Sequence, residues 1–250
     1  MPLEDRLTTL LSGRFLHGLF ASPAGRAFLL NQAADAEGTD EGAIFDRLLR
    51  HVEDPALRKM IERHRADELR HEALLRACIA RTGVVPAPVP PHLRLLDRLD
   101  QKLGGLMQQP VRDDRDVMMS YLVLLVIEER ALNQFALFIP AFERVDPETA
   151  AVFREIARDE ERHLRYCYAI SKRYAPGEAT WAAHLDHLRA IEAKAFSETS
   201  RDVSRHVFEA GLHGAGPIEQ WAWRTVQGLV ARGGNGQRTR FWGTHAPAAA

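Results

Sequence analysis

The stretch Asp67-Glu68-Leu69-Arg70-His71 recurs in the second half of the chain as Asp159-Glu160-Glu161-Arg162-His163, and this repeat decides the fold. The two copies are 92 positions apart, and the same shift places Asp54-Pro55 on Asp146-Pro147 without a gap. An Asp followed by a Pro is typical of a helix N-cap and the first helical position. The sequence therefore predicts two long helices of similar design, each carrying the same five-residue motif.

The rest of the chain also reads as helix. Apolar residues recur at three- and four-residue steps, and no alternating runs suggest strands. The eight residues from Val84 to Pro91 include four prolines, which predicts a long non-helical crossover. Two helix pairs joined by such a crossover predict an all-α four-helix bundle with a leading helix and a C-terminal helix. We expect helices over residues 3–20, 25–52, 55–82, 92–103, 113–142, 147–174 and 180–212, the last with a break near 197–200.

Composition and charge bound the class of protein. With 46% hydrophobic and 27% charged residues, the chain has the composition of a globular protein. A formal net charge of -1 argues against a broadly basic nucleic-acid surface. We expect one helical domain over residues 1–232, with the bundle over 21–174 and a covering helix over 180–212. Residues 233–250, rich in Gly, Arg and Ala, are expected to form a flexible tail.

Cellular context can also be predicted. Two cysteines give no disulfide framework, and the first residues do not resemble a signal peptide. The most apolar run, 117–127, is about half the length needed to cross a bilayer. A cytoplasmic protein with no membrane partner is therefore expected.

The duplicated motif also predicts a metal site. Glu68 with His71, and Glu160 with His163, are each three residues apart, so each pair shares one helix face. Both pairs interrupt apolar stripes that carry no Lys or Arg, and charges on a core-facing stripe are costly unless paired or bound to a metal. Metal binding is therefore favoured over salt bridging. The stripes are Leu57, Ile61, His64, Glu68, His71, Leu75 and Cys78, and Thr149, Phe153, Ile156, Glu160, His163, Cys167 and Ile170.

Each remaining bundle helix should supply one glutamate. Glu128 shares a face with Leu125, Leu132, Phe135 and Ile139, whereas Glu129 falls on another face and is expected to point outward. In the first bundle helix both Glu37 and Glu41 lie on the inward stripe. Glu37 is 31 residues before Glu68 and Glu128 is 32 before Glu160, so symmetry favours Glu37 and leaves Glu41 as the alternative.

Three further features surround this predicted ligand set. Asp67 and Asp159 are placed to orient the histidine of the opposite helix, as carboxylates commonly do for metal-bound imidazoles. Arg70 and Arg162 could hold these aspartates in turn. His64 lies one turn before Glu68 on the same stripe, and it could be an additional ligand or a core histidine that hydrogen-bonds to the ligands.

Asp-Glu-x-Arg-His in duplicate resembles the pattern of the non-haem di-iron carboxylate oxygenases of the ferritin-like superfamily. That resemblance implies two iron ions held by four carboxylates and two histidines, with manganese or a mixed pair as alternatives, and it implies activation of dioxygen. A narrower likeness is to the tRNA hydroxylases that act on methylthio-isopentenyl-adenosine. It rests on Ile127-Glu128-Glu129-Arg130, Glu160-Glu161-Arg162-His163 and Gly83-Val84-Val85-Pro86.

The resemblance implies a hydroxylase or monooxygenase whose substrate is a small molecule or tRNA. An external electron donor is expected, because no flavin or nicotinamide motif is visible. Two alternatives remain, an iron-handling or peroxide-scavenging protein like ferritin or rubrerythrin, and a metal-binding structural bundle. The pattern leaves the oligomeric state open.

Overall fold

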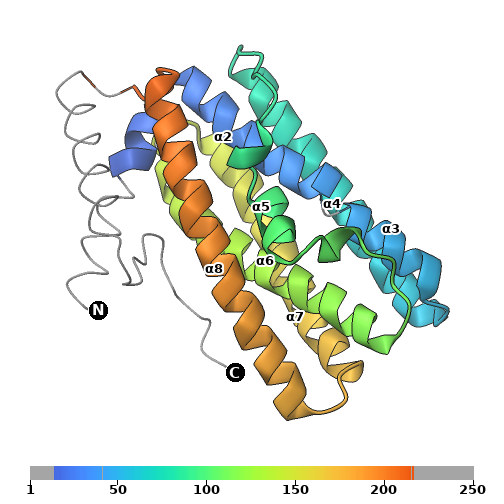
Figure 1. Cartoon of the computed structure of the whole chain (residues 1–250). Coiled ribbons are helices and arrows are strands. Elements are labelled where there is room, and N and C mark those ends of the chain that lie inside the picture. The colour runs from blue at the N-terminus through green and yellow to red at the C-terminus, as the bar shows by residue number, and fades with distance from the viewer. Residues whose placement is uncertain (1–13, 41, 215, 217–250) are drawn as a thin grey trace, which may run out of the picture.

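The chain folds into helices packed side by side (Figure 1). A computed structural model describes residues 14–40, 42–214 and 216, and within these ranges no strand occurs. The all-α prediction is confirmed, and the bundle is compatible with a ferritin-like arrangement, which stays a prediction. Of the predicted leading helix, residues 14–21 are described and helical. Glu41 and the predicted tail over 233–250 lie outside the described residues, as do residues 1–13 and 217–232 of the predicted domain.

Four long arms form the bundle. The first consists of α2 (Pro23–Asp35), the π-helical segment η1 (Ala36–Asp40) and α3 (Gly42–His51), and it packs along α4 (Pro55–Arg81). These two arms form the first pair, and the other two arms, α6 (Asp114–Phe142) and α7 (Pro147–Arg173), form the second pair. The last helix, α8 (Glu178–Glu209), packs on α5 (Leu95–Lys102) and α6.

Both predicted helix starts are confirmed. The Asp54 carboxylate accepts hydrogen bonds from the backbone N–H groups of Ala56 and Leu57 at the start of α4. The Asp146 carboxylate accepts from the backbone N–H of Thr149 at the start of α7. Side-chain caps of this kind satisfy N–H groups that have no partner within the helix. The repeat therefore begins both motif-bearing helices in the same way.

The crossover connects opposite ends of the bundle. It leaves the end of α4, runs along the molecule through η2 (Pro91–Leu93), α5 and η3 (Leu106–Gln108), and reaches the start of α6 at the other end (Figure 1). The predicted helix over 92–103 is thus divided into η2 and α5. This path places α4 and α6 parallel to each other, each antiparallel to its partner helix.

Two further predicted helices differ from the structure. The expected continuous helix over 25–52 is wrong, because η1 separates α2 from α3. Within η1 a side chain at Gly38 would collide with the Glu72 carboxylate of α4, so the glycine allows this segment to approach α4 closely. The expected break near 197–200 is also wrong, since α8 is continuous. Burial of Phe196 and Thr199 against the bundle overrides the low helix propensity of the serines there.

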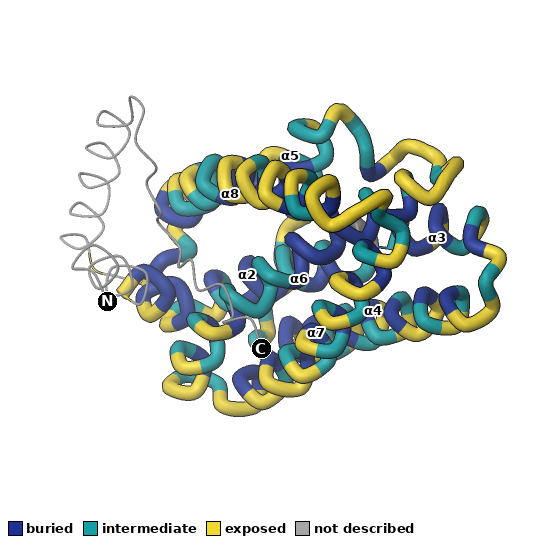
Figure 2. The backbone as a smooth tube through the Cα atoms, turned by 90° about the horizontal axis from the view of Figure 1, so that it is seen from below, coloured by how far each residue is buried: buried dark blue, intermediate teal, exposed yellow. Residues whose placement is uncertain are grey.

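The apolar core is divided by a polar layer. Along α4, Ile61 belongs to one apolar cluster and Leu75 to the other, and along α7 Ile170 and Phe153 do the same. The Glu-x-x-His motifs lie between these clusters on both helices, and the buried stretches face the interior (Figure 2). Within the described ranges, no helix has the length and apolar character needed to span a membrane.

Candidate metal centre

Four glutamates and three histidines converge in the polar layer between the two apolar clusters. They form two groups, and within each group the possible ligand atoms all lie within 4.8 Å of one another. Glu68 belongs to both groups, and all seven side chains are buried. The first group is His64, Glu68, Glu128 and His163, and the second is Glu37, Glu68, His71 and Glu160.

The first group joins α4, α6 and α7. The His64 Nε2 atom lies 2.9 Å from Glu128 Oε1 and 3.0 Å from Glu68 Oε1. The His163 Nδ1 atom lies 3.0 Å from the same Glu68 oxygen and 3.7 Å from the same Glu128 oxygen. Two imidazole nitrogens thus face the same pair of carboxylates.

The second group joins η1, α4 and α7 around one imidazole. The His71 Nδ1 atom lies 3.1 Å from Glu160 Oε1, 3.2 Å from Glu68 Oε2 and 3.4 Å from Glu37 Oε2. Glu37 enters from the π-helical segment. A π-turn adds one residue to a helical turn and is frequent at functional sites.

The ring nitrogens that point away from the ligand groups are held by carboxylates of the opposite helix. The His71 Nε2–H donates to Asp159 at 3.4 Å, and the His163 Nε2–H donates to Asp67 at 3.3 Å. In the neutral form of each ring, these bonds place the proton on Nε2 and leave the Nδ1 lone pair directed to the interior, where a metal could bind it. The predicted cross-bundle pairing of Asp67 with His163 and of Asp159 with His71 is confirmed.

The two aspartates are in turn held by arginines. The Arg162 guanidinium donates to Asp67 at 2.7 Å and to Asp159 at 2.5 Å, and Arg70 donates to Asp159. Burial raises the pKa of Asp159, but the bonds from Arg162 and Arg70 outweigh it and hold that pKa below its usual range. Asp159 therefore stays ionised and accepts the imidazole N–H.

Burial and charge also set the protonation of the seven side chains. Burial, together with Glu160 and Glu37, raises the pKa of Glu68 well above its ordinary value. Burial works against protonation of His71, but its hydrogen bonds to Glu160, Glu37 and Glu68 raise the pKa well above the ordinary range. Burial and the neighbouring His163 hold the pKa of His64 well below its ordinary value. His64 is therefore neutral at pH 7 and can donate a lone pair.

The oxygens of two glutamates lack ordinary hydrogen-bond partners. Oε1 of Glu68 and Oε1 of Glu160 are buried, and no hydrogen bond of acceptable geometry reaches either atom from the described residues. Imidazole nitrogens nevertheless lie 3.0 and 3.1 Å from them. Buried carboxylate oxygens and imidazole nitrogens that converge in this way need a proton or a metal cation between them. The donor set of carboxylates and imidazoles suits iron, manganese or zinc.

The structure brings all six predicted ligands together and adds His64 to them. His64 has 1% of its surface exposed, and its ring lies 3.8 Å from that of His163 between centroids. Glu129, by contrast, pairs with Arg189 of α8 away from the centre, as predicted. Glu41, the alternative to Glu37, lies outside the described residues.

Tyr166 is a neighbour that the sequence analysis did not identify. Its ring lies 5.6 Å from the rings of both His64 and His163, and its hydroxyl accepts from Arg162 at 3.4 Å. The spacing His163-x-x-Tyr166 on one helix face could have indicated it. This tyrosine covers one side of the first ligand group.

Comparisons with protein-family models, with curated proteins and with solved structures found no match for this chain.

Proposed function

We propose that the chain is a ferritin-like non-haem di-iron oxidoreductase that activates dioxygen, and that it acts as a hydroxylase or monooxygenase. The observation that carries this proposal is the pair of buried ligand groups that share Glu68. One glutamate from each of two arms and a Glu-x-x-His from each of the other two is the ligand arrangement of ferritin-like di-iron proteins. Glu37, Glu128 and the two motifs supply this arrangement here.

Iron bound at these residues would supply the electrons for oxygen chemistry. The surrounding residues of the chain have roles that follow from their contacts. Asp67 and Asp159 keep the Nδ1 lone pairs of the two histidines turned inward, and Arg162 links the two aspartates. The apolar clusters on either side exclude water, which strengthens electrostatic interactions within the layer.

His64 gives the proposed centre a third histidine and places two imidazoles, His64 and His163, in the first ligand group. Its Nε2 atom occupies the same group as His163 Nδ1, and its low pKa keeps the ring neutral. A neutral imidazole adds a nitrogen ligand without adding charge. We therefore assign His64 as a seventh ligand, on the side of Glu128.

Metal analysis followed by oxygen consumption tests this function. Protein produced with iron or with manganese in the medium is analysed for metal per chain, then reduced without oxygen and mixed with it while absorbance and oxygen are followed. We expect two iron ions per chain and rapid oxygen uptake that needs an added reductant. Glu68→Gln is the inactive variant, and Glu129→Gln is its control.

Other outcomes of the same experiment would identify the alternatives. Faster consumption of peroxide than of oxygen, or continued oxidation of excess Fe(II), would indicate a peroxide-scavenging or iron-handling protein. Bound metal with no reaction towards either oxidant would indicate a structural bundle. Less than one metal ion per chain after reconstitution with Fe(II) and with Mn(II) would refute the di-metal proposal.

A further inference from the structure

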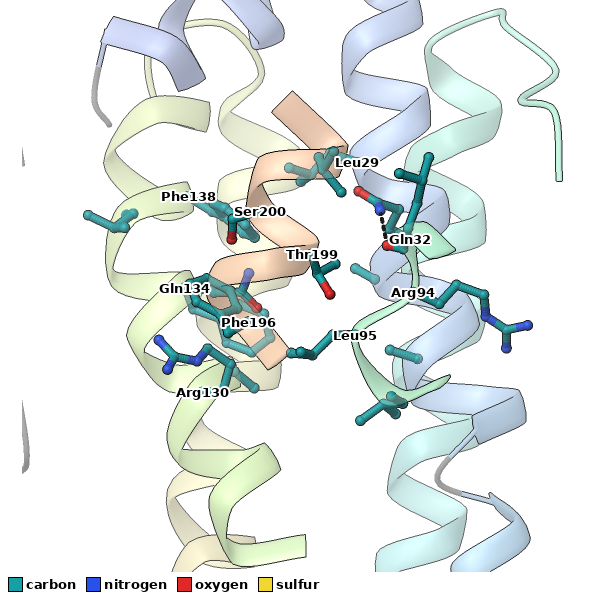
Figure 3. Close-up of a pocket in the computed structure, with 18 of the residues that line it drawn as sticks. Leu29, Gln32, Arg94, Leu95, Arg130, Gln134, Phe138, Phe196, Thr199 and Ser200 are labelled. Carbon is teal, nitrogen blue, oxygen red and sulfur yellow. Dashed lines mark hydrogen bonds between the residues drawn. The ribbon is translucent and has the colours of Figure 1, made fainter. Parts of the chain in front are cut away.

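A cavity of about 180 Å³ lies beside the candidate metal centre and is lined by residues of the helix over 14–21 and of α2, η1, η2, α5, α6 and α8 (Figure 3). One of its lining residues is Glu37, a member of the second ligand group. Ile127, which precedes Glu128 in α6, also lines it. The cavity therefore extends from the interface of α8 with the bundle to the ligands themselves.

The walls of the cavity are largely apolar and aromatic. Phe135, Phe138 and Phe196 contribute rings, and leucines from α2, α5 and α6 fill much of the remaining surface. Pockets with such walls and a few polar groups are typical sites for small molecules. An engineered apolar cavity of about 150 Å³ holds benzene. The volume here suits a single ring with a short substituent.

The two arginines at the cavity are directed away from it or paired with a carboxylate, and Glu37 belongs to the second ligand group. The Arg130 guanidinium makes two bonds of 2.8 Å to Glu192 and lies 3.9 Å from the centre of the Phe196 ring. The Arg94 guanidinium also points away from the cavity (Figure 3). Neither guanidinium is therefore directed at an anionic ligand inside, and with Glu37 assigned to the metal ligands a neutral ligand is favoured.

One buried hydroxyl faces the cavity without a partner. Thr199 has 6% of its surface exposed, and its Oγ1 atom has no hydrogen-bond partner within the described part of the chain. In Figure 3 this oxygen points into the space between α8 and the crossover. A buried polar group without a partner costs free energy that a ligand could recover.

We propose that this cavity binds the substrate, and that the substrate is a small, neutral, mainly apolar molecule whose one hydroxyl or carbonyl group hydrogen-bonds to Thr199. The apolar part lies among the phenylalanines and reaches towards Glu37. That this small molecule is the substrate rests on the proposed oxygenase function, whereas the binding of such a molecule in the cavity does not. The assignment selects a small molecule over tRNA as the substrate.

Three probes of similar shape test the chemistry of the cavity in the purified full-length protein. These are 2-phenylethanol, propylbenzene, in which a methyl group replaces the hydroxyl, and the anion phenylacetate. We expect 2-phenylethanol to bind most tightly in calorimetric titrations and phenylacetate to bind at least about 10-fold more weakly. Tighter binding of phenylacetate, or no detectable binding of 2-phenylethanol, would overturn the proposal.

Two variants locate the binding. Thr199→Val should weaken 2-phenylethanol roughly 2- to 12-fold, the contribution of one neutral hydrogen bond, and should not weaken propylbenzene. Val203→Phe, on the cavity wall, should weaken both by about 10-fold or more because it fills the space. The matched controls are Thr180→Val and Ala193→Phe, at exposed positions of the same helix. Equal effects of a variant and its control would refute the location.

The connection with the metal centre has a separate measurement. Adding 2-phenylethanol to the cobalt(II)-loaded protein should change its visible absorption, because Glu37 contacts both sites. Binding without a spectral change would refute the connection. Protein that binds 2-phenylethanol but takes up no metal would support the cavity proposal and refute the oxygenase proposal. Protein that takes up metal but does not bind 2-phenylethanol would refute the cavity proposal and leave the oxygenase proposal standing. Displacement of the alcohol by micromolar tRNA would overturn the small-molecule assignment.

Discussion

Replacing Glu68 with Gln should remove both metal ions, whereas the same change at Glu128 should remove one. Glu68 is the residue common to both ligand groups, and Glu128 belongs only to the group that contains His64. Gln keeps the volume of the side chain and replaces an anionic ligand with a neutral amide. Glu129→Gln is the matched control, since Glu129 pairs with Arg189 instead.

The expected magnitude follows from the number of ions that each variant retains. An ion present at about 100 times its dissociation constant stabilises the folded state by about 2.7 kcal/mol. For a domain of this size that raises the melting temperature by roughly 5 to 10 °C per ion. Metal should therefore raise the melting temperature by the amount for two ions in the wild type and in Glu129→Gln. It should raise it by the amount for one ion in Glu128→Gln and not at all in Glu68→Gln.

The assay compares the metal-loaded and metal-free forms of each variant. Melting temperature is measured by circular dichroism with Fe(II) under anaerobic conditions and again with excess chelator, and only the difference is used. Effects of each substitution on the metal-free fold then cancel. Metal per chain is measured on the same samples. One retained ion in Glu68→Gln together with none in Glu128→Gln would refute the shared position of Glu68.

Asp67→Asn and Asp159→Asn should each lower metal affinity about 10- to 100-fold, because each removes the acceptor that orients a histidine; competition with a chromophoric chelator measures this, and an unchanged affinity would contradict it. His64→Ile should keep the fold and lower the metal content from two ions towards one, and a variant that retains both ions would show that His64 is not a ligand. Because the pKa of His64 is lowered on folding, its stabilising contribution is complete above pH 6.5 and is lost as the pH falls below that value. In urea unfolding, the metal-free wild type should therefore lose up to about 1.4 kcal/mol per pH unit more than His64→Ile below pH 6.5, and parallel profiles would contradict this. Phe153→Ala should cost about 3 to 5 kcal/mol in the same assay, because Phe153 is fully buried among three other phenylalanine rings; a loss below 1 kcal/mol would show a core that adapts.

The sequence predicted the two motif-bearing helices closely, because their signals are local. The caps at Asp54 and Asp146 mark the starts, and the stripes through Glu68 and Glu160 place the ligands on one face. The repeat also predicted the aspartate–histidine pairs across the bundle. Two equivalent helices that face each other must place equivalent residues in exchanged positions.

Features that depend on distant contacts were not predictable in the same way. The π-helical segment η1 has no signal in the sequence, because Ala34 and Glu37 have the three-residue spacing that also fits a regular helix. The role of His64 depends on Glu128, which is 64 residues away. The cavity is lined by residues of several separate elements, η2 and α5 of the crossover among them, and no single stretch of sequence indicates it.

The buried carboxylates of the centre imply that loading with metal is an exchange of cations for protons. In the metal-free fold the raised pKa values of Glu68 and His71 mean that protons partly neutralise the four glutamates. Each entering ion must displace such protons, because a metal ligand has to offer a free lone pair. Loading should therefore acidify a weakly buffered solution, as a pH indicator dye would report, and the affinity for metal should fall as the pH is lowered. A cell could thus fill or empty this protein through its pH as well as through its supply of metal.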